Sequence, residues 1–248
     1  MRCKIIAAFG TFCLLSVAVY AQDITGNIEI KRRLSKPNVA PPVSVYQRGT
    51  VVKLGHDAAS DPIAYERSRV ALYLEGPLPQ GLERTESSHP TPVQQVQQLD
   101  RRFVPDFVVI PAGASVSFPN ADPIFHNIYS LSKSKSFDLG NYDQGESRTV
   151  TFPKPGIVDV YCHLHSNMSA TVFVVPNRWY ARPDATGAYK IPNVPPGEYT
   201  VVAWHKTAGY FRKKVIVEAG HSSTVDFFIP LDADAPSTPE GAGAGASK

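Results

Sequence analysis

Apolar and polar residues alternate with a period of two along much of the chain, which predicts short strands. The first such segments are Ile24–Ile30 and Arg69–Glu75, and the second ends at a Gly-Pro turn signal. Long amphipathic helical patterns are hard to find, whereas turn-forming residues are plentiful, with 22 prolines and 17 glycines. The pattern therefore predicts an all-β protein built from many short strands and turns.

Strand signals become denser from residue 93 to residue 176. They fall at Phe107–Ile110, Val116–Phe118, His126–Ser130, Phe137–Gly140, Thr149–Phe152, Ile157–Cys162 and Ala170–Val175. A third set follows at Tyr189–Ile191, Tyr199–Trp204, Val215–Val217 and Val225–Ile229. Val51–Glu66 is too weakly patterned to predict an element.

The segment Ile157–Cys162 leads into an unusual loop. With a period of two, Val158, Val160 and Cys162 share one face, and Asp159 and Tyr161 share the other. Cys162 is therefore predicted to point into the core at the end of a strand.

The two ends of the chain differ from the rest. Residues 1–21 have a basic start, an apolar stretch and a small residue at Ala21, which is typical of a cleaved signal peptide, with a membrane anchor as the alternative. We therefore expect a periplasmic or secreted protein with no transmembrane segment in its mature form. Residues 231–248 are rich in Ala, Pro, Gly and Ser and are predicted to be disordered.

Composition narrows the function. The chain has 25 Lys and Arg against 22 Asp and Glu, a formal net charge of +3, and the apparent leader removes two of the basic residues. This balance offers no basic field for nucleic acid, so we expect no nucleic-acid partner.

The loop Cys162–Met168 holds the only Cys and the only Met that remain once the leader is cleaved. His163 and His165 lie between them. A thiolate, an imidazole and a thioether form a copper ligand set, which needs one more histidine for a His₂Cys site with a weak axial Met. Taken singly, Cys162 is also compatible with a buried thiol and Met168 with core filler.

Residues 93–176 resemble the cupredoxins, the type-1 blue copper proteins, and are most similar to amicyanin and the plastocyanin-like proteins of methylamine utilisation. The matching motifs are Phe118-Pro119-Asn120, His126-Asn127 and Tyr161-Cys162-x-x-His165-x-x-Met168. The resemblance implies a Greek-key sandwich that binds one copper ion through His126, Cys162 and His165, with Met168 as the axial ligand. It also implies that Asn127, next to the first ligand, ties the two ligand loops together.

The segments on either side resemble the carboxypeptidase regulatory-like family, which has a transthyretin-like sandwich. The strongest match is residues 187–199, from Gly187 through Pro195-Pro196-Gly197 to Tyr199. The resemblance implies that residues 22–76 and 178–230 form one discontinuous sandwich, joined through a linker at 77–92 to the inserted segment 93–176.

Together these features predict an exported one-electron carrier with a type-1 copper and a periplasmic redox partner, a cytochrome or a dehydrogenase. The alternative is a copper-binding or cell-envelope module that transfers no electrons. An enzyme is not expected, because a fully occupied mononuclear site has no open position. Pro123, Ile124 and Leu164 are expected to form an apolar docking patch around His165.

Two further groups of residues could carry chemistry, namely His163 and three carboxylates. His163 flanks Cys162 as in multicopper oxidases, but Tyr161 takes the other flank and the remaining His-x-His pairs are missing, so His163 is predicted to face away from copper. Asp122, Asp138 and Glu146 have no visible partner and are predicted to be solvated turn residues.

Overall fold

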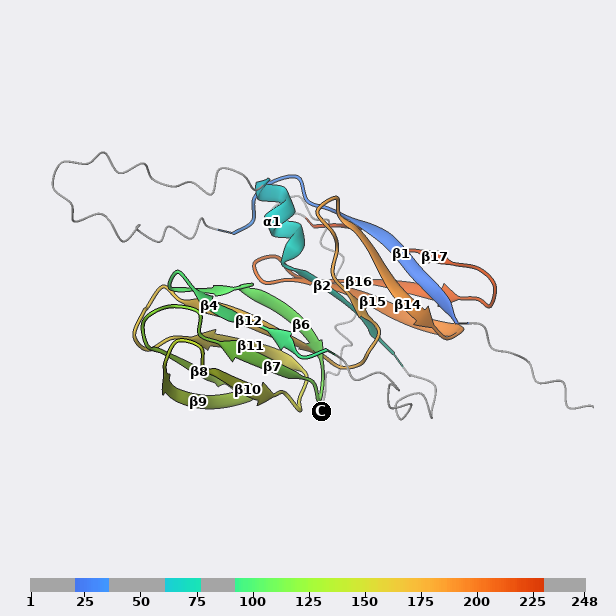
Figure 1. Cartoon of the computed structure of the whole chain (residues 1–248). Coiled ribbons are helices and arrows are strands. Elements are labelled where there is room, and N and C mark those ends of the chain that lie inside the picture. Colours follow the sequence, from blue (N-terminus) through green and yellow to red (C-terminus); the bar gives the residue numbers. More distant parts are fainter. Residues whose placement is uncertain (1–20, 36–60, 77–91, 230–248) are drawn as a thin grey trace, which may run out of the picture.

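The computed structural model describes residues 21–35, 61–76 and 92–229. In these ranges strands dominate, accompanied by one short helix, α1 (Pro62–Ser68). The strands form two sandwiches that lie against each other, one green to yellow and one blue and orange in Figure 1. The all-β prediction is confirmed.

The first body, which we call the central sandwich, consists of two sheets. Its five-stranded sheet has the order β6 (Phe107–Pro111), β12 (Ser169–Val175), β11 (Gly156–Tyr161), β8 (His126–Ser132) and β9 (Lys135–Tyr142). Its three-stranded sheet has the order β10 (Ser147–Thr151), β7 (Ser115–Pro119) and β3 (Gln94–Gln95). A small hairpin, β4 (Gln97–Leu99) and β5 (Arg102–Val104), lies at one end.

The second body, the flanking sandwich, also consists of two sheets. The outer sheet has the order β14 (Ala188–Val194), β1 (Gln22–Glu29) and β17 (Ser223–Thr224), and β18 (Phe227–Phe228) also pairs with β1. The inner sheet has the order β13 (Tyr180–Ala181), β2 (Val70–Glu75), β15 (Gly197–His205) and β16 (Gly209–Val217).

The flanking sandwich takes strands from both sides of the central one. Strand β2 precedes the central segment and pairs antiparallel with β15, which follows it, in a continuous register from Val70↔His205 to Glu75↔Thr200. Strand β1 also pairs antiparallel with β14, with a register shift between Gln22 and Ile24. The chain thus contributes β1 and β2 to the flanking sandwich, then forms the central sandwich, and then contributes the remaining strands of the flanking sandwich. We propose that the domain boundaries are those predicted from sequence, residues 22–76 with 178–230 for the flanking sandwich and 93–176 for the central sandwich.

Alternate side chains of β2 and β12 point to opposite faces of their sheets and belong to different apolar clusters, so the four sheets form stacked layers. In β2, Val70, Leu72 and Leu74 enter the core of the flanking sandwich, whereas Ala71 and Tyr73 face the central sandwich. In β12, alternate residues enter the central core from Ala170 to Val174, and Phe173 and Val175 face the other way. Strands buried on both faces have nearly continuous apolar sequences, as these do.

An apolar cluster joins the two sandwiches. Its buried members are Ala71, Tyr73, Phe107, Val109, Phe173, Val175, Val202 and Trp204. Polar contacts border it: Lys206 Nζ lies 2.7 Å from Asp159 Oδ1, and Tyr65 donates a hydrogen bond to Asp106 over 3.0 Å. The two sandwiches therefore share a continuous buried interface.

Several elements differ in extent from the predicted ones. Helix α1 falls partly where no element was predicted; it begins at the N-cap Asp61, whose carboxylate accepts from the N–H of Ile63, with Pro62 in the first turn. Strands β9 and β16 are longer than expected, with eight and nine residues. Strands β3, β4, β5 and β13 were not predicted, because two or three residues carry no readable period.

Some predictions fall outside the described residues. These are the signal peptide up to residue 20, the linker up to residue 91 and the tail from residue 231. In the part of the chain that the structure does describe, no helix has the length and apolar character needed to cross a membrane.

Candidate metal centre

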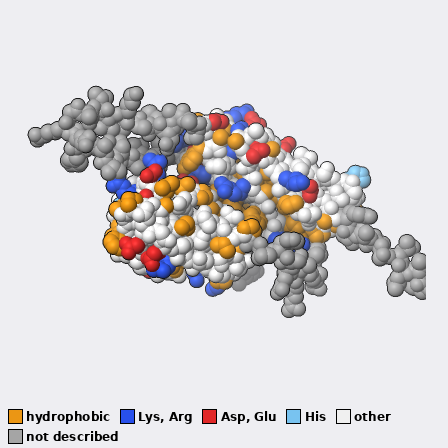
Figure 2. All heavy atoms as spheres, viewed as in Figure 1, with side chains coloured by type: hydrophobic (Ala, Val, Ile, Leu, Met, Phe, Trp, Pro, Cys, Tyr) orange, Lys and Arg blue, Asp and Glu red, His pale blue; other side chains and the backbone are white. Residues whose placement is uncertain are grey.

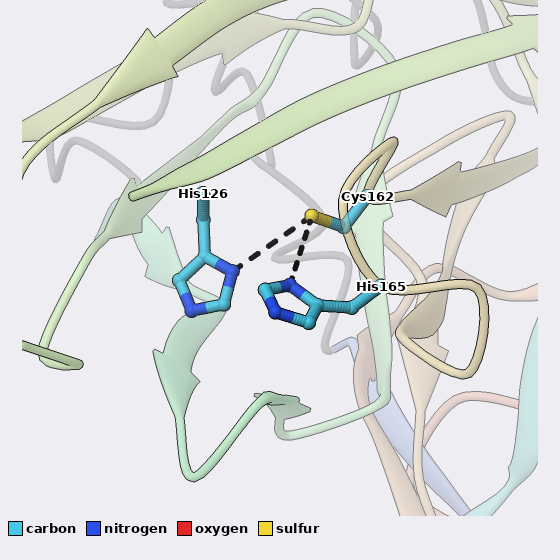
Figure 3. Close-up of side chains that lie close together, drawn as sticks. All are labelled: His126, Cys162 and His165. Atoms are coloured by element: carbon cyan, nitrogen blue, oxygen red, sulfur yellow. Dashed lines mark hydrogen bonds between the residues drawn. The ribbon is translucent and has the colours of Figure 1, made fainter. Parts of the chain in front are cut away.

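Three predicted ligands meet at one end of the central sandwich. His126 is the first residue of β8, Cys162 directly follows β11, and His165 lies three residues further on in the connection to β12. Figure 3 shows both imidazole rings turned toward the sulfur of Cys162. Within the described ranges, they form the one cluster of three or more His, Cys, Asp or Glu side chains arranged to hold a metal ion.

The distances between the ligand atoms suit a shared ion. Cys162 Sγ lies 3.8 Å from His126 Nδ1 and 3.7 Å from His165 Nδ1. Metal–thiolate and metal–imidazole bonds of about 2.3 and 2.0–2.1 Å, at angles between tetrahedral and trigonal, separate the two ligand atoms by about 3.5–3.8 Å. The two distances from sulfur to nitrogen therefore match those of a transition-metal ion shared by the thiolate and each imidazole.

The symmetry of the two contacts favours an ion over a hydrogen bond. A thiol can donate one hydrogen bond and accept another, so hydrogen bonding alone would require the two imidazoles to take opposite roles toward the sulfur. Here both histidines present Nδ1 to the sulfur at nearly equal distances. A cation held between the three atoms accounts for both contacts at once.

Strand phase explains the burial of Cys162. Val158, Val160 and Cys162 all belong to the central core, whereas Asp159 and Tyr161 lie on the other face, so the predicted inward direction of Cys162 is confirmed. The cysteine is a free thiol. Burial keeps water away from the sulfur.

Met168, the predicted axial ligand, belongs to the same buried core as Cys162. Its backbone N–H donates to the carbonyl of His165 over 3.0 Å, which closes the loop into a tight turn. The thioether is thus buried at the base of the ligand loop, on the core side.

The second ring nitrogen of His126, Nε2, contacts a carboxylate. This nitrogen lies 2.7 Å from Asp122 Oδ2, and both side chains are buried. The prediction that Asp122 is a solvated turn residue is therefore wrong. A metal-bound histidine commonly donates its second N–H to such a group, which fixes the ring orientation.

Asp122 is itself fixed by the hairpin β4–β5. The backbone N–H groups of Asp100 and Arg101 donate to its two carboxylate oxygens over 2.6 and 2.8 Å. Burial raises the pKa of Asp122, but the hydrogen bonds from Arg101, His126 and Asp100 together hold it below its usual value. The carboxylate is therefore a stable negative charge next to the cluster.

His165 is less buried than the other two candidate ligands. Burial, followed by the nearby His126 and Arg101, lowers the pKa of its imidazole. A metal ligand must be unprotonated, so a lowered pKa keeps His165 ready to bind. Its partial exposure makes it the ligand closest to solvent.

Asn127 contacts a residue other than those of the ligand loop. Its side-chain amide donates to Asp138 over 2.7 Å, and its Oδ1 is buried without a hydrogen-bond partner among the described residues. Asp138 in turn lies 3.5 Å from His163 Nε2. Asn127 is thus connected to the residue after Cys162 through Asp138.

His163 takes no part in the cluster. It is exposed and stacks on Tyr129, with ring centroids 3.7 Å apart and an interplanar angle of 3°. This position agrees with the prediction that His163 faces away from the ligands.

Apolar residues that neighbour the cluster in sequence are exposed. Pro123, Ile124 and Leu164, the residues of the predicted patch, are all exposed. Phe125, which directly precedes His126, is also exposed, and sequence reasoning missed it. Its position in the loop that leads into β8, directly before the candidate ligand His126, was the signal that could have identified it.

Several solved structures are similar to about a third of this chain. They include a copper-containing nitrite reductase (NirK) from Thermus scotoductus SA-01, with 25% identity, a TM-score of 0.33, and coverage of 34% of this chain and 23% of that one. An amicyanin from Paracoccus versutus has 22% identity, a TM-score of 0.33, and coverage of 36% and 86%. A purple cupredoxin from Nitrosopumilus maritimus has 23% identity, a TM-score of 0.31, and coverage of 33% and 99%.

The chain spans less than a quarter of the nitrite reductase that it matches. No protein-family model matches the sequence, and no curated protein matches it significantly. The function is therefore inferred from the geometry and chemistry of the ligand side chains.

Proposed function

We propose that this chain is an exported type-1 copper protein that carries one electron at a time between redox partners. The observation that supports this most strongly is the position of Cys162 Sγ, 3.8 and 3.7 Å from the Nδ1 atoms of His126 and His165. Three ligands in this arrangement match the trigonal His₂Cys set of such sites.

The donor set favours copper over other metals. A thiolate and a nearby thioether are soft ligands, which select copper rather than a hard cation. Structural zinc is bound by Cys, His and carboxylate ligands, whereas the fourth candidate here is Met168. When bound, copper supplies a one-electron couple between its two oxidation states.

The protein side chains fit this role. His126 and Cys162 are buried, so water does not reach these two candidate ligands. His165 is partly exposed, and the apolar residues Ile124, Phe125 and Leu164, which we call the apolar rim, are exposed and lie next to the candidate ligands in sequence. We propose that electrons pass through His165 and that this rim contacts the partner, a periplasmic cytochrome or dehydrogenase.

We further propose that the protein catalyses no reaction of its own, because four protein ligands leave no open coordination position for a substrate. Figure 2 shows basic and acidic side chains interspersed with apolar ones on one face of the molecule, rather than a field of one sign. Such a mixed surface suits a transient protein partner.

The second candidate is a copper-binding or cell-envelope module without electron transfer. The flanking sandwich motivates it, since a second body is fixed to the first through a buried interface. An electron carrier and a copper-binding module without electron transfer, which we call a storage module, differ in whether copper stays bound when it is reduced.

Cyclic voltammetry of the copper-loaded protein separates the two candidates. A carrier gives a reversible one-electron wave and keeps its copper through repeated cycles. A storage module gives an irreversible wave, or releases copper on reduction, which a Cu(I) chelator in the solution detects. The second result would overturn the proposed electron-transfer role.

A further inference from the structure

The candidate ligand His126 contacts a buried carboxylate, which in turn accepts hydrogen bonds from a strained hairpin turn. The turn between β4 and β5 consists of Asp100 and Arg101, with φ values of 53° and 55°. Two consecutive residues with positive φ are typical of a tight hairpin turn that favours Asn and Gly. Arg101 in this conformation costs energy, and such cost is often found where a structure serves a function.

The turn directs its backbone N–H groups at one side chain. Asp100 and Arg101 donate to Oδ1 and Oδ2 of Asp122 over 2.6 and 2.8 Å. The same Oδ2 lies 2.7 Å from Nε2 of His126. Two backbone N–H groups thus donate to the two oxygens of one carboxylate, which is the environment of an ionised rather than a protonated acid.

The loop that carries Asp122 is also fixed. Asn120 accepts from the N–H of Asp122 over 2.9 Å, and its side-chain amide donates to the carbonyl groups of Ile124 and Tyr142. The N–H of Ala121 donates to the carbonyl of Gln98. Neither the carboxylate nor its backbone can therefore move without breaking several hydrogen bonds.

This arrangement leaves one tautomer for His126. A carboxylate accepts hydrogen bonds and cannot donate them, so Nε2 carries the proton and Nδ1 presents its lone pair to Cys162. His126 is fully buried, so water cannot compete for either nitrogen. The ring is oriented for metal binding before any metal arrives.

We infer that Asp122 is a positioning residue that presets His126 for the metal and lowers the reduction potential of the copper site. The second part rests on the function proposed above. A buried negative charge close to the centre stabilises Cu(II), the more highly charged state, relative to Cu(I). A hydrogen bond from imidazole to carboxylate also makes the imidazole a more basic ligand.

Asp122→Asn removes the charge and keeps a carbonyl oxygen that accepts from His126. In the copper-loaded variant, we expect the ratio of Cu(I) to Cu(II) at a fixed applied potential to rise by about tenfold. For a one-electron couple, this corresponds to a midpoint potential about 59 mV higher. Cu(II) affinity, measured by competition with a chelator, should fall by about 10–100-fold, and Cu(I) affinity by less.

Asp143→Asn is the matched control. Tyr142 of β9 lies opposite His126 of β8, and Asp143 is the next residue. The side chain of Asp143 is exposed. Removing its charge should leave the potential close to that of the unaltered protein, because solvent screens an exposed charge. Equal shifts in the two variants, or no shift in Asp122→Asn, would overturn the inference while leaving the proposed copper site intact.

A measurement on the metal-free, unaltered protein tests the positioning role even if Asp122→Asn does not fold. Two-bond ¹H–¹⁵N correlation spectra should show His126 as the Nε2–H tautomer, with a proton that exchanges slowly with water. An Nδ1–H tautomer would overturn the positioning role. If instead the tautomer is as stated but the protein takes up no copper, the proposed function fails, and with it the effect on potential.

Discussion

Phe173 of the central sandwich stacks on Trp204 of the flanking sandwich, with ring centroids 4.4 Å apart and an interplanar angle of 18°. Both side chains are buried, and the ring of Phe107 is tilted against the same indole, with centroids 5.9 Å apart. Stacked aromatic pairs contribute beyond the area that they bury. The two sandwiches should therefore unfold together rather than as independent domains.

Trp204→Ala should destabilise the protein strongly. Removing a buried tryptophan costs about 3–5 kcal/mol, because the side chain loses its contacts and leaves a cavity. Urea unfolding followed by circular dichroism should show a lower midpoint and a transition that splits in two. Tyr210→Ala is the control, since Tyr210 lies near Trp204 but is exposed, and it should change the free energy of unfolding by less than about 1 kcal/mol. A single unshifted transition in Trp204→Ala would contradict the shared interface.

Lys206→Met should have a small effect, although Lys206 also connects the two sandwiches. Its Nζ lies 2.7 Å from Asp159 Oδ1 and 2.9 Å from Thr171 Oγ1, but the ion pair is partly exposed. Such pairs contribute about 0–1 kcal/mol. Thr171 keeps its hydrogen bond to Asp159 in the variant. A loss as large as that of Trp204→Ala in the same urea experiment would show that charge, not apolar burial, holds the interface.

A buried pair elsewhere in the flanking sandwich predicts acid sensitivity. His205 Nε2 lies 3.1 Å from Glu66 Oε2, and His205 Nδ1 accepts from the N–H of Thr207. Burial lowers the pKa of His205, opposed by Glu66, so the folded state resists protonation. Burial raises the pKa of Glu66, but its hydrogen bonds to Ser35 and Leu34 hold it below its usual value.

The sign of the effect follows from these shifts. As the pH falls through 6.5, the unfolded chain protonates His205 while the folded chain does not, so stability falls. A second loss follows below 4.5, as Glu66 gains a proton in the unfolded state first. The free energy of unfolding of the metal-free protein should therefore be lower at pH 5.5 than at pH 7.5, by at most about 1.4 kcal/mol per pH unit for each proton.

His205→Gln isolates this contribution. Glutamine still donates to Glu66 but does not titrate. Its free energy of unfolding should depend less on pH between 7.5 and 5.5 than that of the unaltered protein. The same slope in both proteins would assign the acid sensitivity to other groups.

The ligand loop was largely predictable from sequence. Cys162, His165 and Met168 lie within seven residues, and the alternation from Val158 to Cys162 determines the direction of the sulfur. The burial of β2, β12 and β15 on both faces was not predicted, although nearly continuous apolar sequences are typical of it. That depends on the pairing of distant surfaces, which period alone does not encode.

Asp122 was missed for a physical reason. Its burial depends on backbone N–H groups of Asp100 and Arg101, some twenty residues upstream, in a hairpin too short to show a period. Helix α1 was missed although a local signal existed, since Asp61 followed by Pro62 is typical of a helix start. Seven residues were too few for helical periodicity to stand out.

His163→Gln should leave metal binding unchanged. His163 stacks on Tyr129, lies near Asp138 and is outside the ligand cluster, so its removal costs exposed contacts only. The variant should bind one copper per chain with the optical spectrum of the unaltered protein. His165→Gln, two residues away, should alter that spectrum. Equal effects of the two changes would show that the ligands have been assigned wrongly within the loop.

The central claim is that Cys162, His126 and His165 bind one copper ion through the thiolate and two Nδ1 atoms. The optical spectrum of the protein titrated with Cu(II) tests it most directly, with Cys162→Ser as the matched variant, because serine keeps the size of the side chain but has no sulfur. We predict an intense visible thiolate-to-copper band that saturates at one equivalent and is absent from Cys162→Ser. Colourless binding, no binding, or the same band in Cys162→Ser would contradict the claim.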